Sequence, residues 1–184
     1  GKASGSITKG KPVIVEADGD FTQDFSVDVP VSYSAGSQQT IKDSDTVGTS
    51  SITYDDALGY FVVFYEQISS SNNGYGRTYT ESDKTLTLSQ SLGSFYTNYT
   101  KILDSVYIGN SVHIVFYENL NSYLASRTVT ISSDGTGTYG TENILVSSAI
   151  YSKGSCYYDS SKDVAVITYS TGSPSYTATA MAVT

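Results

Sequence analysis

The chain has 184 residues, a net charge of −8, a charged fraction of 15% and 17 tyrosines but no tryptophan. The negative charge argues against a protein that holds nucleic-acid phosphates or an anionic membrane with clustered lysine and arginine. No apolar run approaches the ~20 residues of a membrane-spanning helix, whereas tyrosine and threonine favour pleated, half-buried surfaces, so the composition indicates an all-β protein.

The first segment is predicted to form a β-hairpin. An apolar run at residues 13–15 is followed by an Asp-Gly turn signal and then by alternating apolar and polar residues from Phe21 to Val31. This pattern predicts two antiparallel strands with one face to bury. Because an isolated hairpin is only marginally stable in water, we expect residues 1–36 to serve as an anchoring or assembly segment, docked on the rest of the chain or on another subunit.

Residues 37–184 contain one pattern three times, at a spacing of 52 residues. The apolar run "YFVVFYE" at 60–66 returns as "VHIVFYE" at 112–118 and as "VAVITYS" at 164–170. Each run is preceded by a strand-like segment with a tyrosine at or next to its end, and then by a tight polar turn. A third strand-like segment follows it, and in the first two repeats a fourth. The pattern predicts three four-stranded antiparallel units of about 52 residues, with the apolar strand covered on both faces by neighbouring units.

Units of this size and strand number are typical of β-propeller blades, of which a single chain usually has roughly four to eight. Three units leave several architectures open: a six-bladed ring of two chains, a three-fold β-trefoil or β-prism, or an array continued by neighbouring subunits. We favour blade-like units with assembly, because open strand edges have to be covered. The third repeat ends after its third strand, and residues 38–44 are predicted by register to supply the fourth.

Two glutamates and two arginines recur at equivalent positions. Glu66 and Glu118 end the first two apolar runs, and Arg77 and Arg127 lie on the strands that follow. Two carboxylates can catalyse glycoside hydrolysis, but the third repeat has Ser170 in place of the glutamate and no arginine. Because both charges are kept or lost together, we predict two structural ion pairs across neighbouring strands, Glu66–Arg77 and Glu118–Arg127.

The other reactive residue types indicate neither an enzyme nor a cofactor. His113 is the only histidine and Cys156 the only cysteine, so we expect no zinc site and no disulfide framework. Cys156 lies in a strand-like segment that predicts a buried, unreactive thiol. The residue counts allow a serine–histidine–aspartate site, but the sequence has no nucleophile-elbow motif. The aspartates in turns lack the alternating ligand spacing of a calcium loop.

Six tyrosines lie in or beside variable segments rich in serine, asparagine and glycine. They are Tyr75, Tyr96, Tyr99, Tyr123, Tyr151 and Tyr176. Surfaces of this composition are adaptable in recognition, so these tyrosines are the candidates for binding a glycan or a partner; the alternative is that they fill half-buried β surface. Asn98 begins an Asn-Tyr-Thr sequon, an acceptor of N-linked glycan in a host with a glycosylating secretory pathway.

The stretches "NYTKILDSVYIGNSVHIVFYE" and "IYSKGSCYYDSSKDVAVITYSTG" resemble the tandem repeats in virion proteins of tailed bacteriophages. In those repeats a strand ending in Tyr-Asp, a short turn, a Val-rich strand ending in Tyr and a Gly/Thr-rich strand recur. The resemblance covers residues 37–184, and the opening "ITKGKPVIVEADGDF" is similar to the start of some capsid-decorating and fibre proteins. The resemblance implies a propeller-like fibre, head decoration or tail knob that binds surfaces and has no catalytic residues.

These observations predict a non-enzymatic structural protein on a virion surface. It would assemble with itself and with other virion proteins, and its loops would bind a host surface polysaccharide. The alternative is a secreted, extracellular bacterial adhesin or filament subunit that assembles by β-strand exchange. A glycan-active enzyme is a third and less favoured hypothesis. We expect neither nucleic-acid binding nor membrane insertion.

Overall fold

The computed structural model describes residues 13–15, 21–23, 36–40, 46–69, 71–151, 154–171 and 177–184. Contacts divide the chain into Gly1–Ala35 and Gly36–Thr184, next to the boundary predicted between residues 36 and 37. In the first unit, strands β1 (Val13–Val15) and β2 (Phe21–Gln23) pair in antiparallel orientation, as the hairpin prediction requires. The rest of that predicted hairpin, up to Val31, lies outside the described residues.

The second unit is built from antiparallel sheets of four, five and three strands. Sheet 1 contains β3 (Val47–Asp55), β4 (Tyr60–Gln67), β5 (Asn73–Ser82) and β6 (Thr85–Tyr96) in this order. Sheet 2 contains β7 (Lys101–Gly109), β8 (Val112–Glu118) and β9 (Leu124–Ile131), with β10 (Gly137–Tyr139) and β11 (Asn143–Val146) both paired to β9. Sheet 3 contains β12 (Ser155–Asp159), β13 (Val164–Thr171) and β14 (Thr177–Val183). The part of the chain that the structure describes is all-β, so none of it forms a helix that could cross a membrane.

Each predicted apolar run forms the second strand of its sheet. The turn before it ends on a residue in the left-handed backbone region: Gly59 with φ 75°, Ser111 with φ 57° and Asp163 with φ 54°. Only glycine adopts this region without steric cost, and aspartate tolerates it better than most residues. The turns therefore bring the chain back antiparallel at the same point of each sheet.

The first and second strands pair in antiparallel orientation in the three sheets, and register shifts at Ile102/Asp104 and Tyr107/Gly109 move the pairing in sheet 2 by one residue between them. Equivalent pairs are Ser51–Phe64, Asp104–Phe116 and Ser155–Thr168 on one face, and Ile52–Val63, Ser105–Val115 and Cys156–Ile167 on the other. Side chains alternate along a strand, so each sheet has two faces. We call the face of Phe64, Phe116 and Thr168 face A, and the face of Val63, Val115 and Ile167 face B.

Two hydrophobic cores lie where face A of one sheet packs on face B of the next. In the first core, Val62 and Phe64 of sheet 1 meet Val115 and Tyr117 of sheet 2. In the second core, Phe116 of sheet 2 meets Ile167 and Tyr169 of sheet 3, with Ile150 between them in sequence. Each fully buried side chain of this size contributes about 1.5–3 kcal/mol. The second strands are thus apolar because they pack between sheets.

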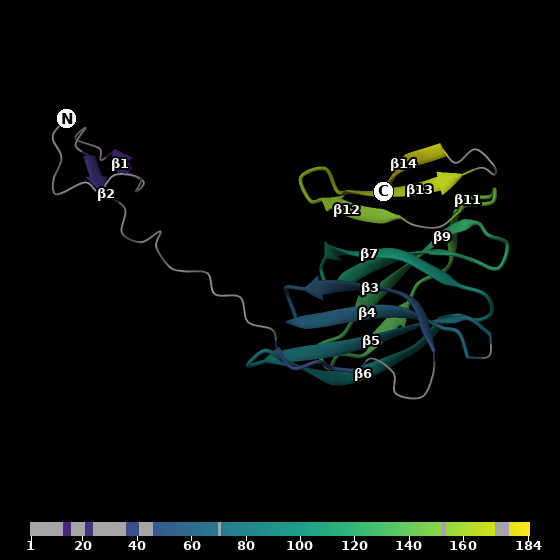
Figure 1. Ribbon diagram of the computed structural model, residues 1–184, viewed down its shortest axis with the longest axis horizontal. Helices are drawn as coiled ribbons and strands as arrows, with labels where there is room; N and C mark the ends of the chain where they lie inside the picture. Colours follow the sequence, from purple (N-terminus) through teal and green to yellow (C-terminus); the bar gives the residue numbers. More distant parts are fainter. Residues whose placement is uncertain are drawn as a thin grey trace. The chain divides into compact units, whose positions relative to one another are not determined.

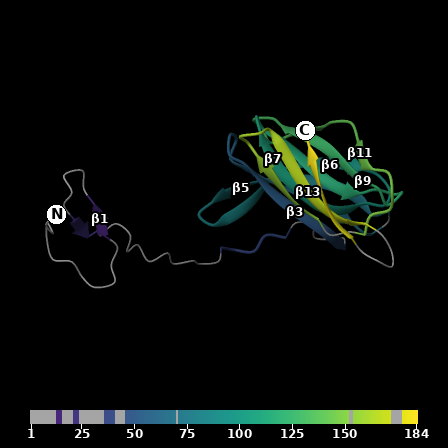
Figure 2. The same ribbon diagram turned by 90° about the horizontal axis from the view of Figure 1, so that it is seen from above.

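The first strands of the three sheets, β3, β7 and β12, lie side by side (Figure 1). Asp104 of β7 links all three: its Oδ1 accepts a hydrogen bond from Ser51 Oγ at 2.8 Å, and its Oδ2 accepts one from the backbone N–H of Cys156 at 2.7 Å. Sheets 1 and 3 extend to opposite sides of this line in Figure 1. In the view from above, β9 and β11 of sheet 2 lie to one side of β3 and β13 (Figure 2).

The fourth strand predicted for sheet 3 is not seen in the described residues. Ser37 instead forms an isolated parallel bridge with Thr85 at the start of β6, and its hydroxyl donates to Thr85 Oγ1 at 3.2 Å. Residues 41–44 of the predicted strand lie outside the described residues. Within the described ranges, β14 pairs only with β13.

Candidate functional site

A cavity of about 470 Å³ lies between the start of β7, the end of β8 and the segment that leads into sheet 3. Its lining residues are Tyr99, Lys101, Glu118, Ser122, Ala149, Ile150 and Tyr151. We call it the tyrosine pocket, because it brings together Tyr99 and Tyr151, two of the six predicted binding tyrosines. Its volume lies within the range of small-molecule sites.

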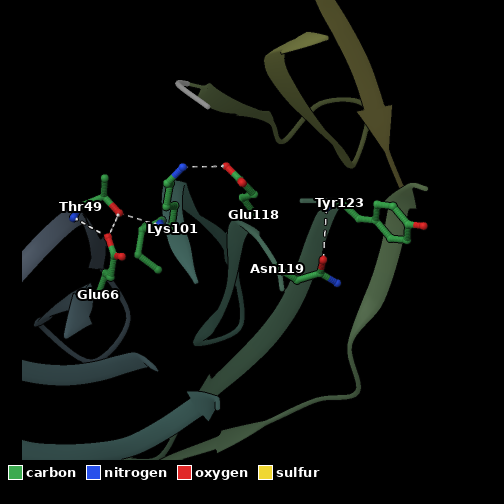
Figure 3. A network of polar contacts seen from close by, with 7 residues as sticks. Thr49, Glu66, Lys101, Glu118, Asn119 and Tyr123 are labelled. Carbon is green, nitrogen blue, oxygen red and sulfur yellow. Dashed lines mark hydrogen bonds and ion pairs between the residues drawn. The ribbon is translucent and has the colours of Figure 1, made fainter. Parts of the chain in front are cut away.

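An ion pair lies in the tyrosine pocket. Lys101 stands directly opposite Glu118 in the β7–β8 register, and its Nζ is 3.4 Å from Glu118 Oε2 (Figure 3). Glu118 is buried, whereas Lys101 is about one-third exposed at 34%. The Lys101 ammonium also lies 5.1 Å from the centroid of the Tyr99 ring. The side chain of Tyr99, followed by the charge of Glu118, raises the pKa of Lys101 against the opposing effect of burial, so the ammonium stays charged between a ring and a carboxylate.

Asn119 holds the loop beside the pocket in place. Its buried side chain accepts a hydrogen bond from the Tyr123 backbone N–H at 3.2 Å and donates one to Glu142 Oε1 at 3.1 Å. Its carbonyl accepts from the backbone N–H of Ser122, whose own carbonyl accepts from Ile150, both at 2.8 Å. We did not predict this residue from the sequence, although an asparagine directly after an apolar strand is typical of a side chain that caps a turn.

Tyr151 forms the rim of the pocket on the side of sheet 3. Its backbone N–H donates to the carbonyl of Ser170 at 2.9 Å, next to the bridge between Ile150 and Thr171. The side chain of Tyr151 is 43% exposed, while Ile150 beside it is buried. The backbone of this aromatic residue is therefore anchored while its ring faces solvent.

The other predicted binding tyrosines do not line the tyrosine pocket. Tyr75 lies in β5 and stacks on Tyr65, with ring centroids 5.8 Å apart. Tyr96 ends β6 and packs against Tyr117 at 5.3 Å. These two half-buried rings follow the alternative interpretation, in which tyrosine fills β surface. Tyr123 lies beside the pocket with its ring pointing away from the Lys101–Glu118 pair (Figure 3), and Tyr176 lies outside the described residues.

The sequon residue Asn98 is exposed in the turn between sheets 1 and 2. Its backbone N–H donates to Asn73 Oδ1 at 2.8 Å, and it adopts a positive φ of 78°. Thr100 of the same sequon is fully buried, and its hydroxyl donates to the Asn98 carbonyl at 3.2 Å. The folded chain thus presents the asparagine but not the threonine to solvent.

The predicted ion pairs Glu66–Arg77 and Glu118–Arg127 are wrong as cross-strand pairs. In the observed register Arg77 stands opposite Val63 and Arg127 opposite Val115, three positions from the glutamates. An odd offset places the two side chains on opposite faces of the sheet. The Arg77 guanidinium accordingly lies 5.8 Å from the Tyr65 ring on face B, whereas Glu66 is on face A.

Glu66 is held by the neighbouring strand β3. Its Oε2 accepts hydrogen bonds from the backbone N–H of Thr49 at 3.1 Å and from Thr49 Oγ1 at 3.2 Å (Figure 3). Thr49 Oγ1 in turn accepts from the backbone N–H of Ile102 at 2.7 Å, which connects sheet 1 to sheet 2. A side chain at Gly48 would collide with the Glu66 carboxylate. At this junction the glutamate has a structural role.

Asp55, Ser111 and His113 come together in the junction between sheets 1 and 2. His113 Nε2 lies 3.6 Å from Asp55 Oδ2, and both side chains are fully buried. Burial lowers the pKa of His113 more than the nearby Asp55 raises it. Ser111 Oγ donates to Asp55 Oδ1 at 3.4 Å, so the serine is bonded to the aspartate and not to the histidine. A serine nucleophile needs a hydrogen bond from its hydroxyl to the histidine, and this trio has none.

Cys156, predicted to be a buried and unreactive thiol, is half-buried. Its pKa is raised by burial and then by the negative charge of Asp104, which disfavours a reactive thiolate. Asp134, one of the turn aspartates, accepts hydrogen bonds from the Thr136 hydroxyl and backbone N–H, which lower its pKa. Within the described part of the chain, no three histidine, cysteine, aspartate or glutamate side chains group as metal ligands.

No family model and no curated protein matches the sequence of this chain.

Proposed function

We propose that this protein is a non-enzymatic structural protein of a bacteriophage virion surface that binds a polysaccharide in the tyrosine pocket. The observation that carries the proposal is the pocket itself, in which two separate aromatic side chains flank an ion pair. A tyrosine ring offers an apolar face for the C–H groups of a sugar and a hydroxyl for its polar edge. Location on a virion is supported by the resemblance of the repeats alone.

The expected ligand is an uncharged, hydroxyl-rich saccharide. Glu118 offers acceptor oxygens and Lys101 donor protons, the two types of group that sugar hydroxyls bind. The charges of Lys101 and Glu118 balance each other, so the pocket has no excess charge for an ionic ligand. The net charge of −8 disfavours an acidic polysaccharide at long range.

The contacts of the two predicted carboxylates, Glu66 and Glu118, support binding over glycoside hydrolysis. Glu118 is paired with Lys101, and Glu66 is hydrogen-bonded to Thr49 at the other junction. Glu118 is the one carboxylate among the lining residues of the tyrosine pocket, whereas hydrolysis requires two carboxylates across one sugar. The purified protein is expected to release no reducing ends from a polysaccharide panel; robust release would overturn the non-enzymatic assignment.

The test of the pocket is equilibrium binding of the full chain to a panel of neutral bacterial surface polysaccharides. Tyr99→Ala and Tyr151→Ala are each expected to weaken binding on the order of tenfold, the effect of removing a well-packed aromatic contact. Tyr123→Ala is the matched control, since this tyrosine lies beside the pocket without lining it. Equal losses in all three variants, or no binding by the wild type, would contradict the proposal.

The virion assignment is tested separately, by mass spectrometry of purified phage particles. The protein is expected in intact particles at a stoichiometric copy number. Detection only in the cytosol of infected cells would count against it. Detection on the surface of uninfected bacteria would favour the second candidate, a secreted adhesin or filament subunit, for which the open edge of β14 in the described residues is the supporting observation.

A further inference from the structure

A second cavity lies at the turns that join the first and second strands of the three sheets. It has a volume of about 320 Å³, and its lining residues are Asp56, Tyr107, Ile108, Gly109, Tyr158 and Ser160. We call it the turn pocket. It shares no lining residue with the tyrosine pocket, and its volume lies at the lower end of the range of small-molecule sites.

The turn pocket adjoins a place where the second junction lacks side chains that the first junction has. At the junction of sheets 1 and 2, Asp55 and His113 are fully buried and face each other. At the junction of sheets 2 and 3, Gly109 and Ala165 have the corresponding positions in the strand pairing. A Cβ atom at Gly109 would meet no atom within 4 Å. The space that Asp55 and His113 close at the first junction therefore stays open beside Gly109.

Two tyrosine rings line the turn pocket, and both hydroxyls interact with carboxylates. The Tyr158 hydroxyl donates to Asp163 Oδ1 at 2.6 Å. Burial, followed by a hydrogen bond to Asp56, raises the pKa of Tyr107. A phenol that donates its proton to a carboxylate has a ring richer in electrons, and an electron-rich ring face attracts a cation.

The charges around the turn pocket also favour a cation. None of its lining residues is basic, whereas Asp56 offers an exposed carboxylate and Ser160 an exposed hydroxyl. Lys162, in the same turn as Ser160, is already paired with Asp159, with Nζ 3.3 Å from Oδ2. The net charge of −8 attracts cations at long range.

We propose that the turn pocket binds the primary ammonium group of a lysine side chain on a partner protein. The two rings offer their faces to the charge, and Asp56 and Ser160 accept hydrogen bonds from its three N–H donors. Ile108 provides an apolar wall for the methylene stem of the lysine. The proposal goes beyond the proposed function and does not depend on it.

The test is an NMR titration of the full chain with lysine whose α-amino and carboxyl groups are both capped as amides. The backbone amide signals of Ile108, Gly109 and Ser160 are expected to shift to saturation, and the affinity is expected to fall with added salt. Capped norleucine, which lacks the ammonium group, is expected to leave these signals unchanged. No shift with capped lysine, or an equal shift with capped norleucine, would overturn the proposal. Tighter binding of glucosamine would overturn the assignment to a protein partner.

Substitutions separate the contributions of the carboxylate and the ring. Asp56→Asn and Tyr158→Leu are each expected to weaken binding of capped lysine about three- to tenfold, while Tyr158→Phe, which keeps the ring, is expected to weaken it less. Asp83→Asn is the matched control for charge, because Asp83 is exposed in the turn between β5 and β6. Tyr157→Leu is the matched control for the ring, because Tyr157 is 71% exposed and does not line the pocket.

Both control variants are expected to bind capped lysine as the wild type does. Unchanged amide signals away from the three turns confirm that each variant remains folded. Equal losses in the variants and their controls, or full binding by Asp56→Asn and Tyr158→Leu, would contradict a lysine site in the turn pocket.

Discussion

Glu66 and Glu118 occupy the same position in two sheets, at the same kind of junction, and yet their surroundings differ. Beside Glu66, a β-bulge in β3 places Gly48 and Thr49 opposite the single residue Glu66. Thr49 binds the carboxylate, and the absence of a side chain at Gly48 leaves space for it. Beside Glu118, the bulge of β7 lies further along, between Ile102 and Asp104, so Lys101 stands directly opposite the glutamate. The adjoining space is a cavity of about 470 Å³.

Equivalent positions in two sheets can therefore have different surroundings, even where the strands that carry them have the same apolar pattern. Both glutamates end an apolar strand that is buried between sheets, so the strand recurs for packing reasons. The residues on the adjoining first strand are free to differ, because they lie at the end of the core. One junction therefore became a closed structural contact, and the other an open pocket with exposed aromatic residues.

The largest loss of unfolding free energy is expected from substitutions in the cores of the two junctions. Phe64→Ala and Phe116→Ala each empty a fully buried position, which typically costs about 3–5 kcal/mol of unfolding free energy. Thr168→Ala at the equivalent exposed position of sheet 3 is expected to cost less than about 1 kcal/mol in the monomer. Urea unfolding of the three variants checks this series; a loss at Thr168 as large as those at the phenylalanines would contradict the equivalence.

An intermediate effect is expected at the closed junction. Gly48→Ala drives a methyl group into the Glu66 carboxylate and disrupts its bonds to Thr49, at a cost of about 1–3 kcal/mol. In a Glu66→Ser background, which copies Ser170 of the third sheet, the same substitution is expected to cost much less. A double-mutant cycle by chemical denaturation measures this coupling. Additive losses would show that the collision with Glu66 is not the cause.

The smallest expected effect is a pH dependence confined to the first junction. Burial lowers the pKa of His113 in the folded state, so the unfolded chain binds the proton more tightly. The stabilising contribution of neutral His113 is therefore complete above the ordinary histidine pKa and is lost as the pH falls through the folded-state pKa, by at most about 1.4 kcal/mol per pH unit.

His113→Phe provides the control for this pH dependence, since Phe61 occupies the equivalent position of sheet 1. It is expected to flatten the loss of stability between neutral and mildly acidic pH, measured by thermal unfolding over that range. The Asp55 carboxylate, which faces His113 across the junction, remains in this variant. An unchanged pH profile would assign the acid sensitivity to other groups.

Local patterns predicted much of the secondary structure. The apolar runs at 60–66, 112–118 and 164–170 form second strands, and the pairing of Val13–Val15 with Phe21–Gln23 follows the hairpin signal. These predictions succeed because strand formation depends on alternation and turn residues within a few positions. The arginine pairs failed because one bulge or turn residue changes the register, and an odd shift moves a side chain to the other face.

The sequence alone determined an all-β chain with three apolar strands in equivalent positions, because burial between sheets requires continuous Val, Ile, Phe and Tyr wherever it occurs. Only the tertiary structure decided which tyrosines meet. Tyr99 and Tyr151 are 52 residues apart in the sequence. They line one pocket because sheet 3 packs on sheet 2, which places the segment before sheet 3 beside the start of β7. Contacts of this separation depend on the packing of whole sheets, which no local pattern encodes.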